Sequence, residues 1–294
     1  MIKIGTRGSK LALWQAEYTQ KQLKDLGVDS ELVIIKTKGD NIQHLSFDKI
    51  EGKGFFTKEL EESLLSGEVD MAVHSMKDLP TEQPAGLVLA AVSYRENPAD
   101  WLIIRQGAEA DGKLLRLPEE AIVGTSSARR KAQMLALRPD VQLKDIRGNV
   151  PTRLEKLRSG DFDAILLAAA GLQRLDIPLD DFTVVRFNPV EFVPAPAQGV
   201  LAFQCREADK ETRRILAKLH HPEVAACTNV ERKVLQLIGG GCHAPLGAYC
   251  KRDNAGNYHA WVAYAKAWDQ PLRRAQLSQA THFRLAEQLL EQLS

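Results

Sequence analysis

Short apolar segments alternate with amphipathic segments through the first half of the chain, and this pattern constrains the fold more than any other feature. Residues 3–6, 31–37 and 69–73 have the composition of strands, and amphipathic helices are predicted between them at 10–26 and 57–66. Strands that alternate with helices in this way are typical of a parallel α/β sheet. The alternation then repeats, with strands expected at 121–124, 141–146 and 163–168 and helices expected at 128–137 and 151–159.

In both series a strand leads through a short polar turn into a helix. Ser9 is predicted to cap the helix at 10–26. The second series has the turns Thr125-Ser126-Ser127 and Arg147-Gly148-Asn149, and basic residues follow each turn. Lys or Arg in a first helical turn opposes the helix dipole, so its presence there needs another reason. Such residues either lie solvated on the surface or bind an anion together with the free N–H groups of the helix.

The segment from 125 to 158 is strongly basic. It contains nine Lys or Arg and three Asp or Glu, which gives a net charge of +6, whereas the whole chain carries only +1. A local excess of this kind indicates a ligand with several carboxylates or phosphates, while the balanced total gives no support for binding to nucleic acid or to a membrane surface. No P-loop is present and no GxGxxG follows a strand, so nucleotide binding is not predicted either.

The strand at 69–73 leads into the sequence HSMKDLP, where Pro80 ends regular structure. This places Ser75, Lys77 and Asp78 at the carboxyl end of the strand. Open α/β sheets bind their ligands at the carboxyl ends of strands, so these three side chains are candidate site residues.

The pattern changes toward the C-terminus. Residues 192–206 form a proline-punctuated crossover followed by a strand that is expected to return to the first sheet. Beyond residue 209 the order of elements favours a small α+β domain. Its helices are expected at 211–219, 222–237 and 280–293, and its strands at 248–250, 258–264 and 272–277.

Three glycines precede Cys242 in the sequence IGGGCHAPLG. Their freedom to adopt positive φ favours an exposed, reachable thiol. The residues alone leave several roles open for Cys242: a nucleophile, a metal ligand, a covalent attachment point, or a buried cysteine beside a glycine turn. The neighbouring His243 makes only a weak hydrolase dyad, because adjacent side chains usually point apart. None of the four cysteines lies in a CxxC pair, so neither a zinc ribbon nor a disulfide framework is predicted.

Two classes of function fit these observations. One is an enzyme that acts on a polycarboxylate or phosphate ligand and uses the thiol. The other is a non-catalytic receptor for a small anion, which would need neither the third domain nor the thiol. The N-terminus has no apolar leader and no apolar run reaches membrane length, so a cytoplasmic protein is expected.

Seven motifs together resemble the porphobilinogen deaminase family, whose members are also called hydroxymethylbilane synthases. Order and spacing agree over essentially the whole chain. The motifs are GTRGSKLALWQA at 5–16, GKGFFTKELE at 52–61, DMAVHSMKDLP at 70–80, VGTSSARRKAQ at 123–133, IRGNVPTRLEKL at 146–157, DAILLAAAGLQRL at 163–175 and GGGCHAPLGAY at 239–249.

The resemblance implies a dipyrromethane cofactor joined to Cys242 by a thioether. Four porphobilinogen molecules would be added to it head to tail with loss of ammonia, and hydrolysis would release hydroxymethylbilane. Asp78 matches the catalytic carboxylate, which assists departure of the amine and stabilises the cationic azafulvene and the pyrrole nitrogens. A monomer without nucleic-acid or membrane partners is also implied.

Further site residues follow from the resemblance, position by position. The cofactor-binding positions are Lys53, Ser75, Lys77, Asp78, Thr125, Ser127, Arg129, Arg130, Arg147 and Gly148. The substrate-binding positions are Arg7, Ser9, Phe56, Arg147, Arg153, Arg174 and Gln198.

The implied architecture has two similar periplasmic-binding-protein-like α/β domains around a cleft and a small C-terminal α+β domain. Residues 1–96 and 193–210 would form the first domain, 97–192 the second and 211–294 the third. The family usually has GQGA in the crossover, whereas this chain has Ala197-Gln198-Gly199-Val200. If position 197 requires a positive φ, alanine costs about 1 kcal/mol there.

Overall fold

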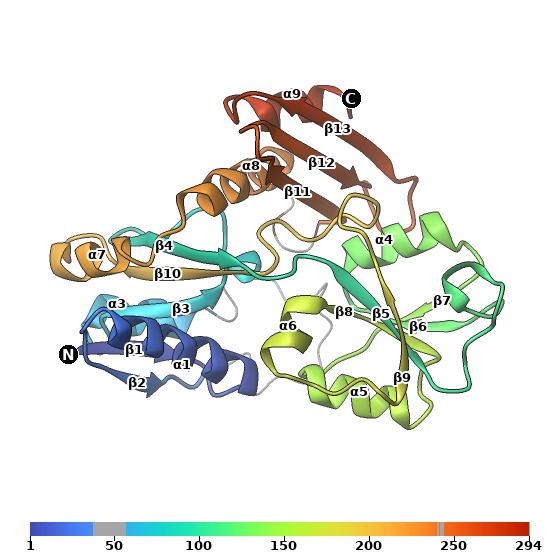
Figure 1. The fold of residues 1–294 in the computed structure, drawn as a ribbon, viewed down its shortest axis with the longest axis horizontal. Helices are drawn as coiled ribbons and strands as arrows, with labels where there is room; N and C mark the ends of the chain where they lie inside the picture. The colour runs from blue at the N-terminus through green and yellow to red at the C-terminus, as the bar shows by residue number, and fades with distance from the viewer. Residues whose placement is uncertain (38–56, 240, 242–243, 294) are drawn as a thin grey trace. The chain divides into compact units, whose positions relative to one another are not determined.

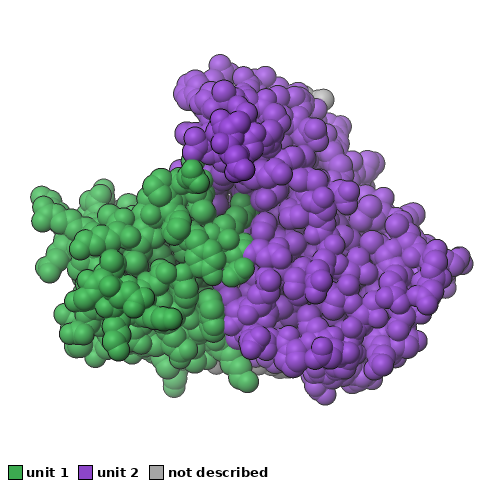
Figure 2. All heavy atoms as spheres, in the orientation of Figure 1, with its two compact units in different colours: residues 1–45, 49–96, 199–226 green, residues 46–48, 97–198, 227–294 purple. Residues whose placement is uncertain are grey.

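The computed structural model describes every residue except 38–56, 240, 242–243 and 294. The chain forms two compact units, one drawn from residues 1–45, 49–96 and 199–226 and the other from 46–48, 97–198 and 227–294 (Figure 2). The division into three domains expected from the sequence stays a prediction.

The first unit is built on a mixed five-stranded sheet with the order β2-β1-β3-β10-β4 (Figure 1). The first three strands are parallel, and β10 is antiparallel to both of its neighbours. Its elements are β1 (Ile2–Thr6), α1 (Lys10–Asp25), β2 (Ser30–Ile34), α3 (Lys58–Ser66), β3 (Met71–Ser75), the 3₁₀ turn η2 (Met76–Asp78), β4 (Leu87–Arg95), β10 (Val200–Arg206) and α7 (Lys210–Ala217).

The second unit contains a five-stranded sheet with the order β7-β6-β8-β5-β9, in which β5 is antiparallel to both neighbours. Its elements are β5 (Asp100–Arg105), η3 (Leu114–Arg116), β6 (Ile122–Gly124), α4 (Ala128–Leu137), β7 (Gln142–Lys144), α5 (Val150–Arg158), β8 (Ala164–Ala168), α6 (Ala169–Arg174) and β9 (Phe182–Arg186).

The same unit also holds a three-stranded antiparallel sheet near the C-terminus, with the order β11-β12-β13. These strands are β11 (Leu246–Arg252), β12 (Tyr258–Tyr264) and β13 (Arg273–Gln279). Helix α8 (Pro222–Ile238) precedes the sheet, and α9 (Leu285–Glu291) packs on β12 and β13. The expected small α+β arrangement is therefore present.

The two five-stranded sheets have the same plan, three parallel strands followed by an antiparallel fourth strand and then a fifth. This confirms the expectation of two similar α/β domains. The strands expected to form parallel sheets are parallel in both series, and β10 and β5 join them as fourth strands whose antiparallel direction was not predicted. The chain passes from β4 directly to β5 and from β9 to β10, so β10 does return to the first sheet as predicted.

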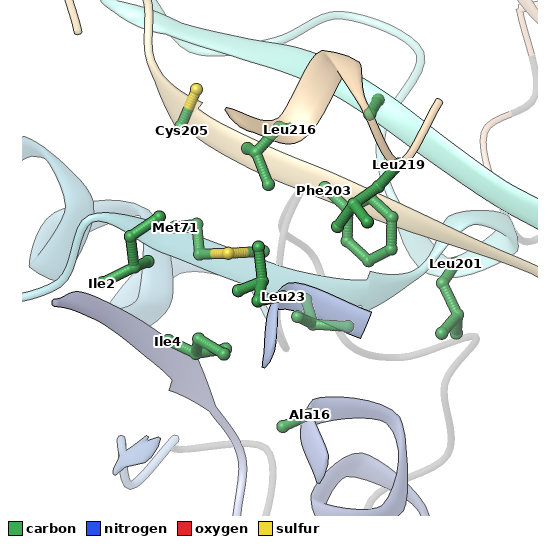
Figure 3. Close-up of a cluster of buried hydrophobic side chains, with 12 residues drawn as sticks. Ile2, Ile4, Ala16, Leu23, Met71, Leu201, Phe203, Cys205, Leu216 and Leu219 are labelled. Atoms are coloured by element: carbon green, nitrogen blue, oxygen red, sulfur yellow. The ribbon is translucent and has the colours of Figure 1, made fainter. Parts of the chain in front are cut away.

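Strand β10 is buried in the core of the first unit. Phe203 of β10, Met71 of β3, Leu23 of α1 and Leu216 of α7 are all 0% exposed and lie in one cluster (Figure 3). Successive side chains of a strand point to opposite faces, so Gln204 lies on the other face of β10. Helix α3 packs on β1, β3 and β10, and six of the seven residues of β10 are buried.

Candidate active site

The segment after β3 presents the strand-tip residues as the sequence predicts. Strand β3 ends at Ser75, and the single turn η2 carries Lys77 and Asp78 before Pro80. Asp78 is exposed, whereas Ser75 and Lys77 are half-buried. The Ser75 hydroxyl accepts a hydrogen bond of 2.9 Å from Nε2 of the buried Gln15 on α1. The carboxylate is thus accessible on a segment whose base is fixed.

The turn after β1 holds Arg7 and Ser9 beside this segment. Ser9 caps α1 as predicted, because its Oγ accepts a hydrogen bond of 3.3 Å from the Ala12 N–H. The pKa of His74 is lowered to about 4, mainly by burial; the hydrogen bond with Gln204 opposes this shift, and the positive charge of Arg7 adds to it. His74 is therefore neutral at neutral pH, and its imidazole supplies no charge to the site.

The turn after β6 also leads into a helix capped by serine, and additional hydrogen bonds hold the side chains of this turn. Ser127 caps α4 by accepting a hydrogen bond of 3.5 Å from the Arg130 N–H. Thr125 is 1% exposed and its Oγ1 accepts from the Ser127 N–H. The Ser126 hydroxyl donates to the Ile146 carbonyl and accepts from the Ile146 N–H. These bonds fix the backbone at the start of α4.

Arg129 and Arg130 are buried and share one carboxylate, that of Asp100 at the start of β5. Arg129 Nη1 donates to Asp100 Oδ2 at 2.6 Å, and Arg130 donates to Oδ1 from Nη2 at 2.7 Å and from Nε at 3.2 Å. Burial by itself would raise the pKa of Asp100, but the two guanidinium groups outweigh it and hold the pKa well below its usual range. Two positive charges and one negative charge leave this group with a net charge of +1.

Gln198 belongs to the same buried group. Its Nε2 donates to Asp100 Oδ1 at 3.0 Å and to the Pro98 carbonyl at 2.8 Å, and its side chain is 1% exposed. The sequence reasoning missed Asp100. The available signal was an acid at the start of the apolar strand ADWLIIR, where a charge needs a buried partner.

The turn after β7 places further guanidinium groups. Asn149 caps α5 through a hydrogen bond of 3.0 Å from the Thr152 N–H to its Oδ1. Gly148 has φ 112, and a Cβ there would lie 2.7 Å from Cγ2 of Thr152, so only glycine fits. The Gly148 carbonyl accepts a hydrogen bond of 2.8 Å from Arg153 Nε. This bond holds the half-buried Arg153 against the turn.

Arg130, Arg147 and Arg153 gather positive charge from three separate elements. The pKa of Arg153 falls to about 10, first because burial removes water and then because Arg130 and Arg147 repel its charge. Only Arg130 among them is paired with Asp100. Arg174, on α6 of the same unit, is also buried, with 6% exposure. A cluster of guanidinium groups with excess positive charge fits a ligand that bears several carboxylates.

The glycine loop is described in part. Gly239 and Gly241 have φ of 75 and 57, and a Cβ at either position would meet nothing within 4 Å. Positive φ in open space agrees with the prediction for these two glycines. Cysteines 205, 227 and 250 are all free of disulfides and buried. The predicted site residues Lys53, Phe56 and Cys242 lie outside the described residues.

Within the part of the chain that the structure describes, no cluster of three or more His, Cys, Asp or Glu side chains is arranged to hold a metal ion. None of its helices is both long enough and apolar enough to cross a membrane.

The fold is of the mixed α/β class, with two five-stranded sheets and a small C-terminal sheet. Residues 2–214 match the family model described as "Porphobilinogen deaminase, dipyromethane cofactor binding domain". The chain belongs to the porphobilinogen deaminase family.

Relatives with that name align over most of their length. The porphobilinogen deaminase of Shouchella clausii (strain KSM-K16) is 51% identical over 84% of this chain and 79% of the relative. That of Streptococcus sanguinis (strain SK36) is 41% identical over 100% of this chain and 95% of the relative. Among solved structures, a periplasmic substrate-binding protein of an ABC transporter from Coxiella burnetii is 13% identical with a TM-score of 0.46 over 77% of this chain and 94% of that chain.

Family membership places the chain among the transferases of tetrapyrrole biosynthesis that use a dipyrromethane cofactor. The alternative of a non-catalytic anion receptor is therefore not favoured.

Proposed function

We propose that the protein is a hydroxymethylbilane synthase. Four porphobilinogen molecules are joined head to tail, one ammonia leaves at each joining, and hydrolysis releases hydroxymethylbilane. The observation that carries the proposal is the cluster of Arg130, Arg147 and Arg153, in which burial and then the charges of the other two arginines lower the pKa of Arg153. Each pyrrole bears an acetate and a propionate, so a growing chain supplies several carboxylates that guanidinium groups bind.

Dipyrromethane, when bound, supplies the primer to which the substrate units are joined. We propose that Cys242 holds it through a thioether. The other three cysteines are buried, and burial raises the pKa of Cys205 to about 11, which disfavours the thiolate needed for attachment. The residues proposed to hold its carboxylates and pyrrole rings are Lys53, Ser75, Lys77, Asp78, Thr125, Ser127, Arg129, Arg130, Arg147 and Gly148.

Asp78 is the proposed catalytic residue. Its exposed carboxylate on η2 is a fixed negative charge that stabilises the cation left when porphobilinogen loses ammonia. The side chains proposed to bind substrate carboxylates or to line the site are Arg7, Ser9, Phe56, Arg147, Arg153, Arg174 and Gln198. Arg129 and Gln198 contribute through Asp100, because their described hydrogen bonds go to that carboxylate and to backbone carbonyls.

Intact mass under denaturing conditions tests the attachment. The wild-type chain is expected to carry the mass of two condensed pyrrole units, and Cys242→Ala is expected to carry none. Cys227→Ala is the matched control, because Cys227 is buried on α8 and should leave the adduct in place. An unmodified wild-type chain that still converts porphobilinogen would overturn the assignment.

The family resemblance also supports a cytoplasmic enzyme that works as a monomer. Sedimentation equilibrium of the loaded enzyme over a range of concentrations tests the second point. A mass of one chain throughout that range is expected, and a concentration-dependent dimer mass would contradict it.

A further inference from the structure

A buried amide lies next to the segment that carries Asp78. Gln204 sits in the middle of β10 and is 0% exposed, and its register partner on β3 is Ala72. His74, two residues further along β3, is on the same face and is 6% exposed. His74 Nε2 and Gln204 Oε1 are 3.0 Å apart. The amide oxygen can only accept, so the imidazole donates this hydrogen bond from Nε2.

The other end of the same amide reaches the chain beyond Asp78. Gln204 Nε2 donates to Gln83 Oε1 at 2.9 Å, and Gln83 Nε2 donates to the Pro80 carbonyl at 3.2 Å. One side chain therefore connects the strand that enters the segment at 75–80 with the loop that leaves it. The half-buried Glu61 of α3 also lies within hydrogen-bonding reach of Gln204.

We propose that Gln204 is a positioning residue for the segment that carries Asp78. Residues 76–78 form a single 3₁₀ turn, too short to fix its own orientation. Its position depends on the burial of Met76 and Leu79 and on both flanks, and Gln204 ties the flanks together through His74 and Gln83. A 1 Å displacement of a catalytic group can cost about 100-fold in rate. This inference rests on the proposed catalytic role of Asp78.

Substitution of Gln204 separates positioning from ligand binding. Gln204→Leu keeps a similar volume but removes both hydrogen bonds. The expected result is a fall in kcat of about 10-fold, because the turn should move by only part of the displacement of about 1 Å that costs 100-fold. KM for porphobilinogen is expected to change by less than about 2-fold, because carboxylate binding depends on arginines elsewhere. The adduct mass should stay unchanged.

A second variant covers the case in which the buried substitution prevents folding. Gln83 is half-buried in a loop, so Gln83→Leu breaks the outer link with little risk to the core. It should lower kcat by about 3-fold, and the double variant should be no slower than Gln204→Leu, because both changes break one connection. Gln204→Glu keeps the acceptor for His74 and should recover part of the lost kcat.

Gln20→Leu is the matched control. Gln20 is a half-buried glutamine of α1 in the same unit whose Nε2 donates to the Ser30 carbonyl, and its loss should leave kcat unchanged. A wild-type kcat in both Gln83→Leu and a folded Gln204→Leu would overturn the inference, as would equal changes in kcat and KM. If the wild-type enzyme released no ammonia from porphobilinogen, or Asp78→Asn kept full turnover, the proposed function would fail instead.

Discussion

The two five-stranded sheets share a plan but carry opposite chemistry at corresponding places. In each sheet the second strand leads through a polar turn into a helix capped by serine, Ser9 on α1 and Ser127 on α4. In each sheet the third strand is followed by a short turn of helix. That turn carries Asp78 after β3, whereas α6 after β8 ends at the buried Arg174.

The difference lies in the partners that each sheet supplies to its site. The first sheet holds the base of its strand tip through neutral groups, namely Gln15, Gln204 and a neutral His74, while Lys77 and Arg7 lie close to the same segment. The second gathers arginines, two of which, Arg129 and Arg130, share the buried acid Asp100. One plan thus carries an exposed carboxylate on one sheet and an arginine cluster on the other, which suits the separate tasks proposed for them in catalysis and in carboxylate binding.

The largest effect is expected from loss of the buried acid of the second sheet. Asp100→Asn leaves Arg129 and Arg130 buried without a counter-charge, which should lower the free energy of unfolding by about 3–5 kcal/mol. Urea unfolding of both proteins measures this difference. Asp181→Asn is the control, because its pair with Arg158 is exposed and should be worth less than about 1 kcal/mol. Equal losses in the two variants would contradict the assigned role of Asp100.

The difference in the free energy of unfolding between wild type and Asp100→Asn should depend on pH, and its direction follows from the sign of the shift in the pKa of Asp100. The pKa of Asp100 is depressed in the folded state, so its stabilisation is complete above the unfolded pKa of about 3.9 and is lost as the pH falls below it. The gap between wild type and Asp100→Asn should therefore be constant from pH 7 to about pH 5 and shrink below about pH 4. A gap that stays constant down to the lowest measurable pH would show that the carboxylate is not held charged by the arginines.

The next effect concerns the acid of the first sheet. Asp78→Asn should keep the adduct on Cys242 but lose about 100-fold or more in kcat, because the neutral amide cannot stabilise a developing cation. Rapid-quench measurement of ammonia release and the intact mass together test this. Asp25→Asn, an exposed acid at the end of α1, should keep wild-type turnover. Wild-type rates in Asp78→Asn would exclude the catalytic role.

The sequence predicted those parts of the fold and the site that depend on local signals. The cap at Ser9, the polar turn at 125–127 and the strand tip at Asp78 each follow from a few neighbouring residues. The partners of the site were not predicted, because they are distant along the chain. Asp100 is 29 residues from Arg129, and Gln204 is 130 residues from His74. The antiparallel directions of β10 and β5 were not predicted for the same reason. The direction of each strand depends on the sheet from which the chain arrives.

A smaller effect is expected from Arg153, the half-buried member of the arginine cluster on α5. Arg153→Gln removes a charge that Arg130 and Arg147 repel, so the apo protein should lose little stability. KM for porphobilinogen should rise by about 10-fold, because a charged hydrogen bond to a carboxylate contributes about 1.5–3 kcal/mol. Arg158→Gln on the same helix is the control, because Arg158 pairs with Asp181. An unchanged KM in Arg153→Gln would remove Arg153 from the binding set.

The smallest effect concerns the crossover that returns the chain to the first sheet. Ala197 has a positive φ of 62, so alanine occupies a left-handed conformation that favours glycine. The cost predicted for alanine at a positive φ therefore applies. Its N–H donates to Glu231 Oε2 at 2.6 Å, and glycine would keep this bond. Ala197→Gly should therefore raise the free energy of unfolding by about 0.5 kcal/mol. This value is the strain that glycine relieves, reduced by the greater conformational entropy that glycine gives to the unfolded chain. Ala195→Gly, two residues earlier and without positive φ, should instead lower it by about 0.5 kcal/mol. Thermal unfolding of both variants decides the point, because changes of the same sign in the two would mean that the left-handed backbone at 197 costs nothing.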